Sequence, residues 1–328
     1  MPAERFGRDV LPDAVKPIHY DLSIHDLELG GSFTYQGTVS IQAKIVRSTN
    51  EIVLNSHQLK IHSAEVTVEQ AKSQASFKST GIEFDVSWRR VTISFPEPLP
   101  VSDKVLITLK FQGNINEDMA GFSRARYKPA APPVASVPIE GDHHLMFSTQ
   151  FEACDARRAF PCFDEPNLKA TFDFEIEIPS DLVALSNMPE KGKRNTKDGF
   201  NVVSFERTPV MSTYLLAWAV GDFEYIEDFT KRRYNGKTLP VRVYTTRGLK
   251  QQAQYALDHA PKVIDYFSEV FGIDYPLPKA DLLAVHEFVS SILLHKFPKL
   301  SLFLVFGAVW CNSTRPIVPL YLFVLSKS

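Results

Sequence analysis

TFDFEIEI, residues 171–178, decides the fold because its apolar and acidic residues alternate without interruption. In an extended strand, successive side chains point to opposite faces, so the apolar and the acidic residues separate onto two sides. The apolar side comprises Phe172, Phe174, Ile176 and Ile178, and the acidic side Asp173, Glu175 and Glu177. A sheet with one buried and one solvated face requires this pattern. The stretch therefore predicts a half-buried strand in an antiparallel β domain.

Similar short alternating segments run from Tyr20 to about Tyr225, and prolines, glycines and asparagines separate them as turn residues do. The segments are YDLSIHDLEL (20–29), TVSIQAKIV (38–46), IEFDV (82–86), RVTISF (90–95), KVLITLKF (104–111) and NVVSFE (201–206). Residues 128–144 are too rich in proline for a regular element, which predicts an exposed loop. The first two thirds of the chain is thus expected to be mostly β.

The pattern changes after residue 225. One more strand, PVRVYT (240–245), precedes residues 248–272, where apolar residues recur every three or four positions as in an amphipathic helix. Pro261 removes a backbone donor and is expected to kink this helix or split it in two. Gly272 is a plausible stop, and KADLLAVHEF (279–288) then reads as a buried strand.

Composition excludes several classes of function. The 36 Lys and Arg residues against 38 Asp and Glu residues give a net charge of −2, which argues against nucleic-acid or anionic-membrane partners. The N-terminal residues are charged and lack an apolar targeting segment, so a cytoplasmic location is expected. Three cysteines without CxxC spacing favour reduced thiols. The apolar runs 300–311 and 317–325 are too short to span a bilayer, so no membrane partner is expected.

Two dipeptides that contain histidine raise the question of a metal site. His286-Glu287 begins like the zinc motif H-E-x-x-H, in which two imidazoles share a helix face, but Ser290 stands where the second histidine belongs. Its surroundings also read as a strand, so we interpret it as an ordinary pair at a strand end. His143-His144 lies in the proline-rich segment and is interpreted as solvated surface. No metal ligands and no catalytic residues are predicted in this chain.

The densest group of polar residues lies in STQFEACDARRAFPCFDEPNLKATFDFEI, residues 148–176. Gln150 and Glu152 flank Phe151, so on a strand they would share a face, where a carboxamide and a carboxylate can receive an ammonium group. From the residues alone, a functional and a structural interpretation of this pair both stay open. Structural ion pairs are the preferred interpretation of five further residues, Asp155, Arg157, Arg158, Asp164 and Glu165.

With TQFEACDARRAFPCFDEPNLKATFDFEIEIPSDLVALSNMPE (149–190), RTPVMSTYLLAWAVGDFEYIE (207–227) and YPLPKADLLAVHEF (275–288), the chain resembles the N-terminal part of the gluzincin zinc aminopeptidases. Within that family it is similar to the puromycin-sensitive and fungal cytosolic enzymes, and the resemblance covers about residues 10–288. It implies an N-terminal β saddle domain at 1–222 and the first α/β part of a thermolysin-like catalytic domain at 223–288. It also implies that Gln150 and Glu152 bind the free α-amino group of peptide substrates.

The resemblance stops after Phe288, before any G-A-M-E-N or H-E-x-x-H motif, so the chain is expected to be truncated. Zinc is implied for the complete enzymes, whereas no zinc is expected to bind this chain, which is predicted to be inactive alone. Residues 289–328 form a divergent apolar tail whose opening Val289-Ser290 suits a translated intron. The alternative is a non-catalytic β module that binds peptides or partner proteins.

Overall fold

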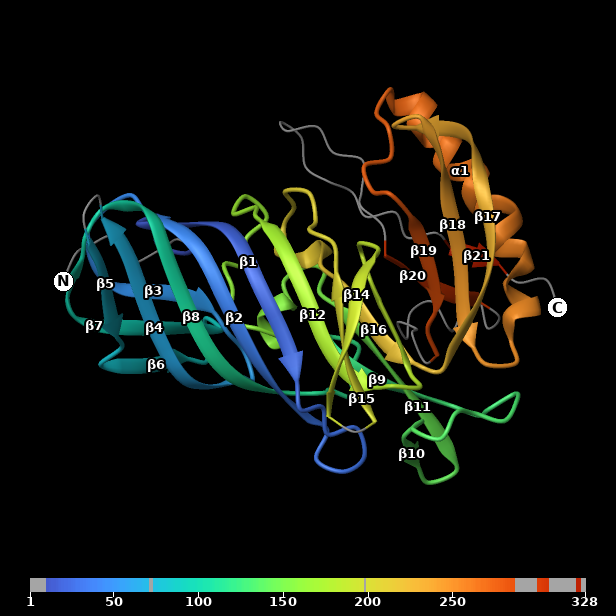
Figure 1. Ribbon diagram of the computed structural model, residues 1–328, viewed down its shortest axis with the longest axis horizontal. Helices are drawn as coiled ribbons and strands as arrows, with labels where there is room; N and C mark the ends of the chain where they lie inside the picture. The colour runs from blue at the N-terminus through green and yellow to red at the C-terminus, as the bar shows by residue number, and fades with distance from the viewer. Residues whose placement is uncertain (1–9, 71–72, 198, 287–299, 307–322, 326–328) are drawn as a thin grey trace.

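The computed structural model describes residues 10–70, 73–197, 199–286, 300–306 and 323–325. Figure 1 shows an elongated arrangement in which the strands within residues 49–114 lie at one end, those within residues 15–45 and 121–221 nearer the middle, and the helix and strands from residue 223 onward at the other end. Among the described residues, no helix is long and apolar enough to cross a membrane.

The largest sheet has eight strands in the order β14-β15-β12-β1-β2-β8-β4-β5. Their bounds are β1 Val15–His25, β2 Thr34–Ile45, β4 Lys60–Gln70, β5 Ser73–Lys78, β8 Ser102–Asn114, β12 Thr171–Pro179, β14 Glu190–Lys197 and β15 Phe200–Phe205. Every neighbouring pair is antiparallel except β1 and β12, which run parallel with Tyr20 beside Phe172. The two rings stack with centroids 4.8 Å apart in the core.

Strand β12 follows the predicted alternation, with one exception. Its four apolar side chains are buried and Asp173 is partly exposed, but Glu177 is only 8% exposed. The expectation that Glu177 faces water was wrong, because Thr196 and the Asp26 backbone donate hydrogen bonds to its carboxylate at 2.7 and 3.3 Å. These partners compensate for the loss of water.

Two smaller sheets complete the N-terminal part. The first contains three antiparallel strands, β3 Thr49–Asn55, β7 Arg90–Leu99 and β6 Gly81–Asp85. The second joins β9 Gly121–Tyr127, β10 Ile139–Glu140, β11 His143–Gln150, β13 Val183–Ser186 and β16 Trp218–Gly221. The predicted loop over 128–144 therefore ends sooner than expected, because Ile139 to Glu140 and the first residues of β11 pair with each other.

The C-terminal sheet has the order β17-β18-β19-β20-β21 and carries the one α-helix of the described residues. Its elements are β17 Phe223–Tyr234, β18 Lys237–Thr246, η4 Lys250–Ala253, α1 Gln254–Phe271, β19 Ala280–Ala284, β20 Leu300–Phe306 and β21 Phe323–Leu325. Helix α1 packs on β17 and β18 (Figure 1), and β18 and β19 are parallel, so β18, α1 and β19 form a βαβ unit.

The predicted mostly β fold with a first α/β part is confirmed. The predicted split at Pro261 is wrong, since one helix continues through this buried proline, and the alternative of a kink stays a prediction. The helix ends before Gly272, whose φ of 63° is the left-handed conformation expected of a C-terminal cap. The predicted change of character at Val289 lies outside the described residues, although β20 pairs antiparallel with β19.

Candidate functional site

Gln150 and Glu152 lie where β11 ends and the loop toward β12 begins. Between them Phe151 is buried, and its ring meets the Trp218 ring edge-on with centroids 5.3 Å apart. The strand stops at Gln150, so the prediction that both residues belong to one strand was wrong for Glu152, which starts a turn. The alternation nevertheless persists across this end, because both polar side chains are half-buried on either side of the anchored phenylalanine.

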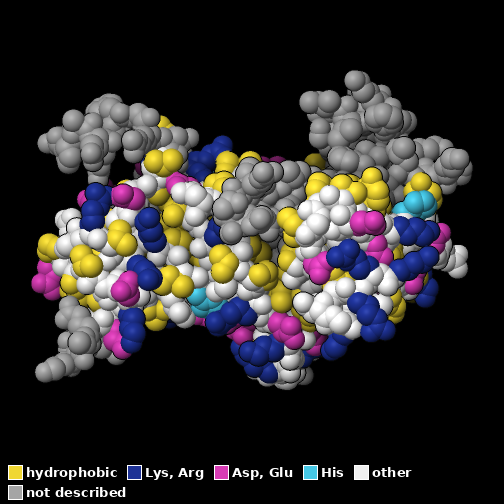
Figure 2. Space-filling model, turned by 90° about the horizontal axis from the view of Figure 1, so that it is seen from above, with side chains coloured by type: hydrophobic (Ala, Val, Ile, Leu, Met, Phe, Trp, Pro, Cys, Tyr) yellow, Lys and Arg dark blue, Asp and Glu magenta, His cyan; other side chains and the backbone are white. Residues whose placement is uncertain are grey.

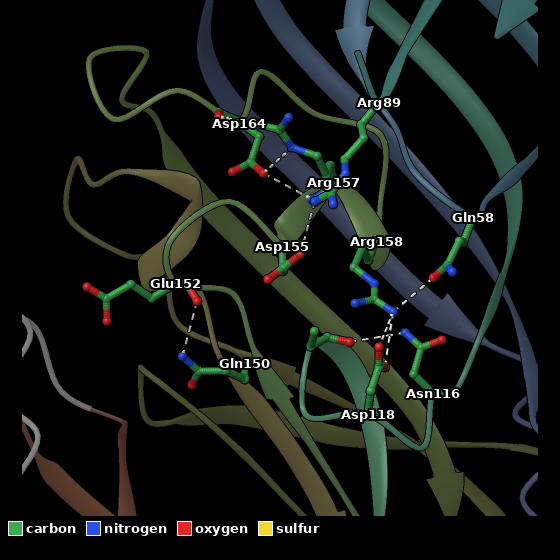
Figure 3. A network of polar contacts seen from close by, with 11 residues as sticks. Gln58, Arg89, Asn116, Asp118, Gln150, Glu152, Asp155, Arg157, Arg158 and Asp164 are labelled. Atoms are coloured by element: carbon green, nitrogen blue, oxygen red, sulfur yellow. Dashed lines mark hydrogen bonds and ion pairs between the residues drawn. The ribbon is translucent and has the colours of Figure 1, made fainter. Parts of the chain in front are cut away.

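The two side chains have different orientations in Figure 3. The Gln150 amide nitrogen donates to the backbone oxygen of Glu152 at 3.5 Å, and the Glu152–Ala153 peptide bond is cis. The Glu152 carboxylate points away from the arginines of the following loop. The Glu152 carboxylate and the Gln150 amide therefore lie on the side of the loop away from its ion pairs.

Strand β9 pairs with β11 and contacts the loop through Gly121. Gly121 lies opposite Gln150 in the β9–β11 pair and has a φ of 74°, which favours glycine. A Cβ atom at this position would lie 2.7 Å from the Cβ of Arg158 in the short helix η2, Ala156–Arg158. Gly121 thus permits a close approach that positions the loop, and a single sequence shows neither the contact nor the backbone angle.

Asp164 is the centre of the ion pairs on the other side of the loop. Its side chain is 2% exposed and accepts hydrogen bonds from Arg157 Nε at 2.9 Å and Thr213 Oγ1 at 2.6 Å. Its backbone N–H donates to Asn55 Oδ1 at 3.0 Å. A buried carboxylate requires such partners. Arg157 and Asp164 therefore hold the loop to β3 and to the segment before β16, as the structural interpretation predicted.

The remaining residues of the group also serve the loop. Arg158 Nη2 donates to Asp118 Oδ2 at 2.8 Å and to Gln58 Oε1 at 3.0 Å. Glu165 accepts a hydrogen bond from the backbone of Leu11. Asp155 lies 4.0 Å from Arg89, and partial burial raises the pKa of its carboxyl group, against the opposing charges of Arg158 and Arg89.

His286 has a structural role at the end of β19. Its ring stacks on Tyr127 of β9 with centroids 5.0 Å apart, and its Nε2 lies 2.9 Å from the Thr246 hydroxyl. It therefore ties the C-terminal sheet to the middle sheet. Glu287 lies outside the described residues. The residues near His286 do not fit the zinc of an H-E-x-x-H site, because the second histidine is missing from the sequence.

The other residues singled out from the sequence are arranged as follows. His143 and His144 begin β11 and are half-buried, so their assignment to a solvated loop was wrong. The His144 ring contacts Tyr127, which explains why this end of the strand is covered. Cys154 and Cys162 are free thiols, and burial raises the pKa of Cys162 well above its ordinary value.

Comparison with known proteins identifies the family. The Peptidase M1 N-terminal domain matches residues 16–215. Over 289 residues the chain is 39% identical to Aminopeptidase 2, mitochondrial, of Saccharomyces cerevisiae, covering 87% of this chain and 28% of that protein. It is 38% identical to Aminopeptidase M1 of Arabidopsis thaliana and 37% identical to the Puromycin-sensitive aminopeptidase of Caenorhabditis elegans, with 30% and 28% of those proteins covered.

The chain thus spans less than a third of the length of these relatives. The match includes the β11 strand, the loop with its ion pairs and strand β12. Together with the mostly β architecture, these similarities place the chain in the M1 peptidase family, of which it contains the N-terminal domain.

Proposed function

We propose that this chain is the amino-group recognition part of a zinc-dependent aminopeptidase, with Gln150 and Glu152 as the residues that bind the free N-terminus of a peptide. The observation that carries the proposal is the orientation of the Glu152 carboxylate, half-buried and directed away from the neighbouring arginines. A carboxylate in this environment favours an ammonium group by charge and hydrogen bonding. The relatives are named aminopeptidases, which supports the same assignment.

The domain organisation is part of this proposal. Residues 1–222 would form the N-terminal domain and residues 223–288 the start of the catalytic domain. In support, β17 begins at Phe223, and the sheet that it starts shares no ladder with the other described sheets. The divergent tail at 289–328 and its origin as translated intron stay predictions.

The two residues would fix the register of the substrate. Glu152 neutralises the α-ammonium group, and the Gln150 side-chain oxygen can accept a hydrogen bond from it, so that the first peptide bond is presented for cleavage. In a complete enzyme, zinc supplies the polarisation of the scissile carbonyl and the activation of water. Because the sequence contains no H-E-x-x-H motif, we expect the 328-residue chain to bind peptides without hydrolysing them.

Peptide binding tests the recognition role. Isothermal titration of the 328-residue chain with a short peptide is expected to show binding at least about tenfold tighter than with its N-acetylated form. Glu152→Gln should remove most of this preference. Glu97→Gln is the matched control, since Glu97 is an exposed glutamate on β7, in a different sheet.

The outcomes separate two functions. An unchanged preference in Glu152→Gln would contradict the assignment of the carboxylate. Binding of free and acetylated peptides with equal affinity would favour a non-catalytic β module that binds peptides without recognising the free α-amino group. Zinc-dependent hydrolysis of an aminoacyl reporter by the chain would contradict the expected inactivity. The cytoplasmic location also stays a prediction, to be checked by cell fractionation.

A further inference from the structure

Three potential metal ligands, two of them far from the candidate site in sequence, meet on the largest sheet. His19 and Asp21 lie two residues apart on β1, and Asp173 lies on β12, beside Asp21 in the parallel register. Among the described residues, this is the one group of three such side chains whose ligand atoms all lie within 4.8 Å of one another. Two adjacent central strands hold it, which makes the arrangement rigid.

The histidine ring is oriented by its environment. The His19 side chain is 4% exposed, and its Nδ1 lies 2.7 Å from the hydroxyl oxygen of Thr171 on β12. The Nε2 atom is consequently directed at the two carboxylates, at 3.2 Å from Asp21 Oδ1 and 3.5 Å from Asp173 Oδ2. A hydrogen bond to one ring nitrogen that directs the other toward carboxylates is the usual environment of a metal-binding histidine.

These distances favour a metal over a shared proton. A charge-assisted N–H···O bond is about 2.7–2.9 Å long, shorter than both contacts. In a tetrahedral zinc site with bonds of about 2.0–2.1 Å, neighbouring ligand atoms lie about 3.3–3.4 Å apart. The two separations, 3.2 and 3.5 Å, lie on either side of that value.

We propose that His19 Nε2, Asp21 Oδ1 and Asp173 Oδ2 bind one divalent cation of the borderline class to which Zn²⁺ belongs. One imidazole and two carboxylates suit such an ion, with water completing the shell. The ion cross-links β1 to β12, so its role is to stabilise the sheet, and it takes no part in peptide hydrolysis. The sequence pointed to no metal site, because 152 residues separate His19 from Thr171 and slightly more separate it from Asp173.

Arg207 limits the affinity of this site. Its Nε donates to Asp173 Oδ1 at 2.9 Å and its Nη2 to Oδ2 at 2.6 Å. These hydrogen bonds lower the pKa of Asp173 and keep the ligand ionised, whereas the positive charge of the guanidinium repels a cation. Replacing Arg207 with glutamine should therefore strengthen metal binding, while replacing either aspartate should weaken it.

The test uses the 328-residue chain without a histidine tag, with Zn²⁺ alone as the probe. Equilibrium dialysis followed by metal analysis is expected to show one bound zinc that Asp21→Asn weakens by at least about tenfold. Asp21 is half exposed, so this variant is expected to fold even if His19→Gln does not. His25→Gln is the matched control, since His25 also pairs with one carboxylate, Asp26, at 2.9 Å, but has no second one among the described residues.

Thermal unfolding gives an independent readout. Zinc that binds the folded chain should raise the melting temperature of the wild type and of His25→Gln, and should raise that of Asp21→Asn much less. Arg207→Gln should require less zinc for the same shift. Equal zinc binding by the wild type and Asp21→Asn, or no bound zinc at all, would overturn the proposal and leave His19 as a hydrogen-bonding partner of the aspartates.

Discussion

The two sides of the loop from Gln150 to Glu165 contain the same kinds of residue but use them differently. On one side, the buried Asp164 carboxylate accepts hydrogen bonds from an arginine and a threonine. On the other side, Glu152 extends its carboxylate away from every arginine of the loop (Figure 3). The carboxylates of one short segment therefore lie in two different surroundings, and for Glu152 we propose that these surroundings serve to bind a ligand.

The largest effect should come from breaking the structural side. Asp164→Ala leaves the guanidinium of Arg157, 13% exposed, without its buried partner. We expect the free energy of unfolding to fall by about 3–5 kcal/mol, because an uncompensated buried charge is costly. Urea unfolding followed by tryptophan fluorescence measures this loss, since buried Trp218 contacts Phe151 at the start of the loop.

A matched control is Asp118→Ala, which removes the partner of Arg158 from an exposed position. Its cost should be only about 1 kcal/mol, because the lost carboxylate is 61% exposed and Arg158, although 11% exposed, keeps its hydrogen bond to Gln58. Similar losses for the two alanine variants would mean that burial does not decide which ion pair holds the loop.

A smaller effect on stability is expected when Glu152, on the other side of the loop, is changed. Glu152→Gln should alter the free energy of unfolding by less than about 0.5 kcal/mol, because its half-buried carboxylate points away from the ion pairs. The same urea titration applies. A loss comparable to that of Asp164→Ala would show that Glu152 is structural, and it would remove the contrast between the two sides.

The smallest effect concerns Asp155, between Glu152 and Asp164 in the sequence. Burial raises its pKa above the ordinary 3.8, so above pH 3.8 the folded chain binds more protons than the unfolded chain. The contribution of Asp155 to stability therefore decreases as the pH rises through that window. Asp155→Asn lacks this dependence and should gain stability relative to the wild type from pH 3.8 upward, measured by urea unfolding at several pH values. The opposite trend would mean that Arg158 and Arg89 outweigh burial.

Local patterns in the sequence predicted most of the strands. Alternation is visible within single segments, so Phe172 and Phe174 could be assigned to the core before their partners were known. The parallel pairing of β1 with β12 could not be predicted, because the alternation within a strand does not indicate which distant strand will pair with it. The continuation of the helix through Pro261 could not be predicted either, because the packing of this buried proline on the sheet is a contact between distant segments.

The candidate site was predictable to a similar degree. Gln150 and Glu152 could be chosen from the motif, and the ion pairs around Asp164 from the density of charge. The early end of β11, the supporting position of Gly121 and the meeting of His19 with Asp173 depend on contacts between distant segments. Such contacts are properties of the folded chain that one sequence does not display.

The parallel β1–β12 pair also has a consequence for synthesis on the ribosome. His19 and Thr171, its first aligned residues, are 152 residues apart. At about 5–20 residues per second, β12 emerges roughly 8–30 s after β1. Until then β1 can pair only with β2, and its other edge offers unpaired backbone groups to any extended chain nearby. The nascent chain therefore passes through a period in which that edge is open to non-native pairing.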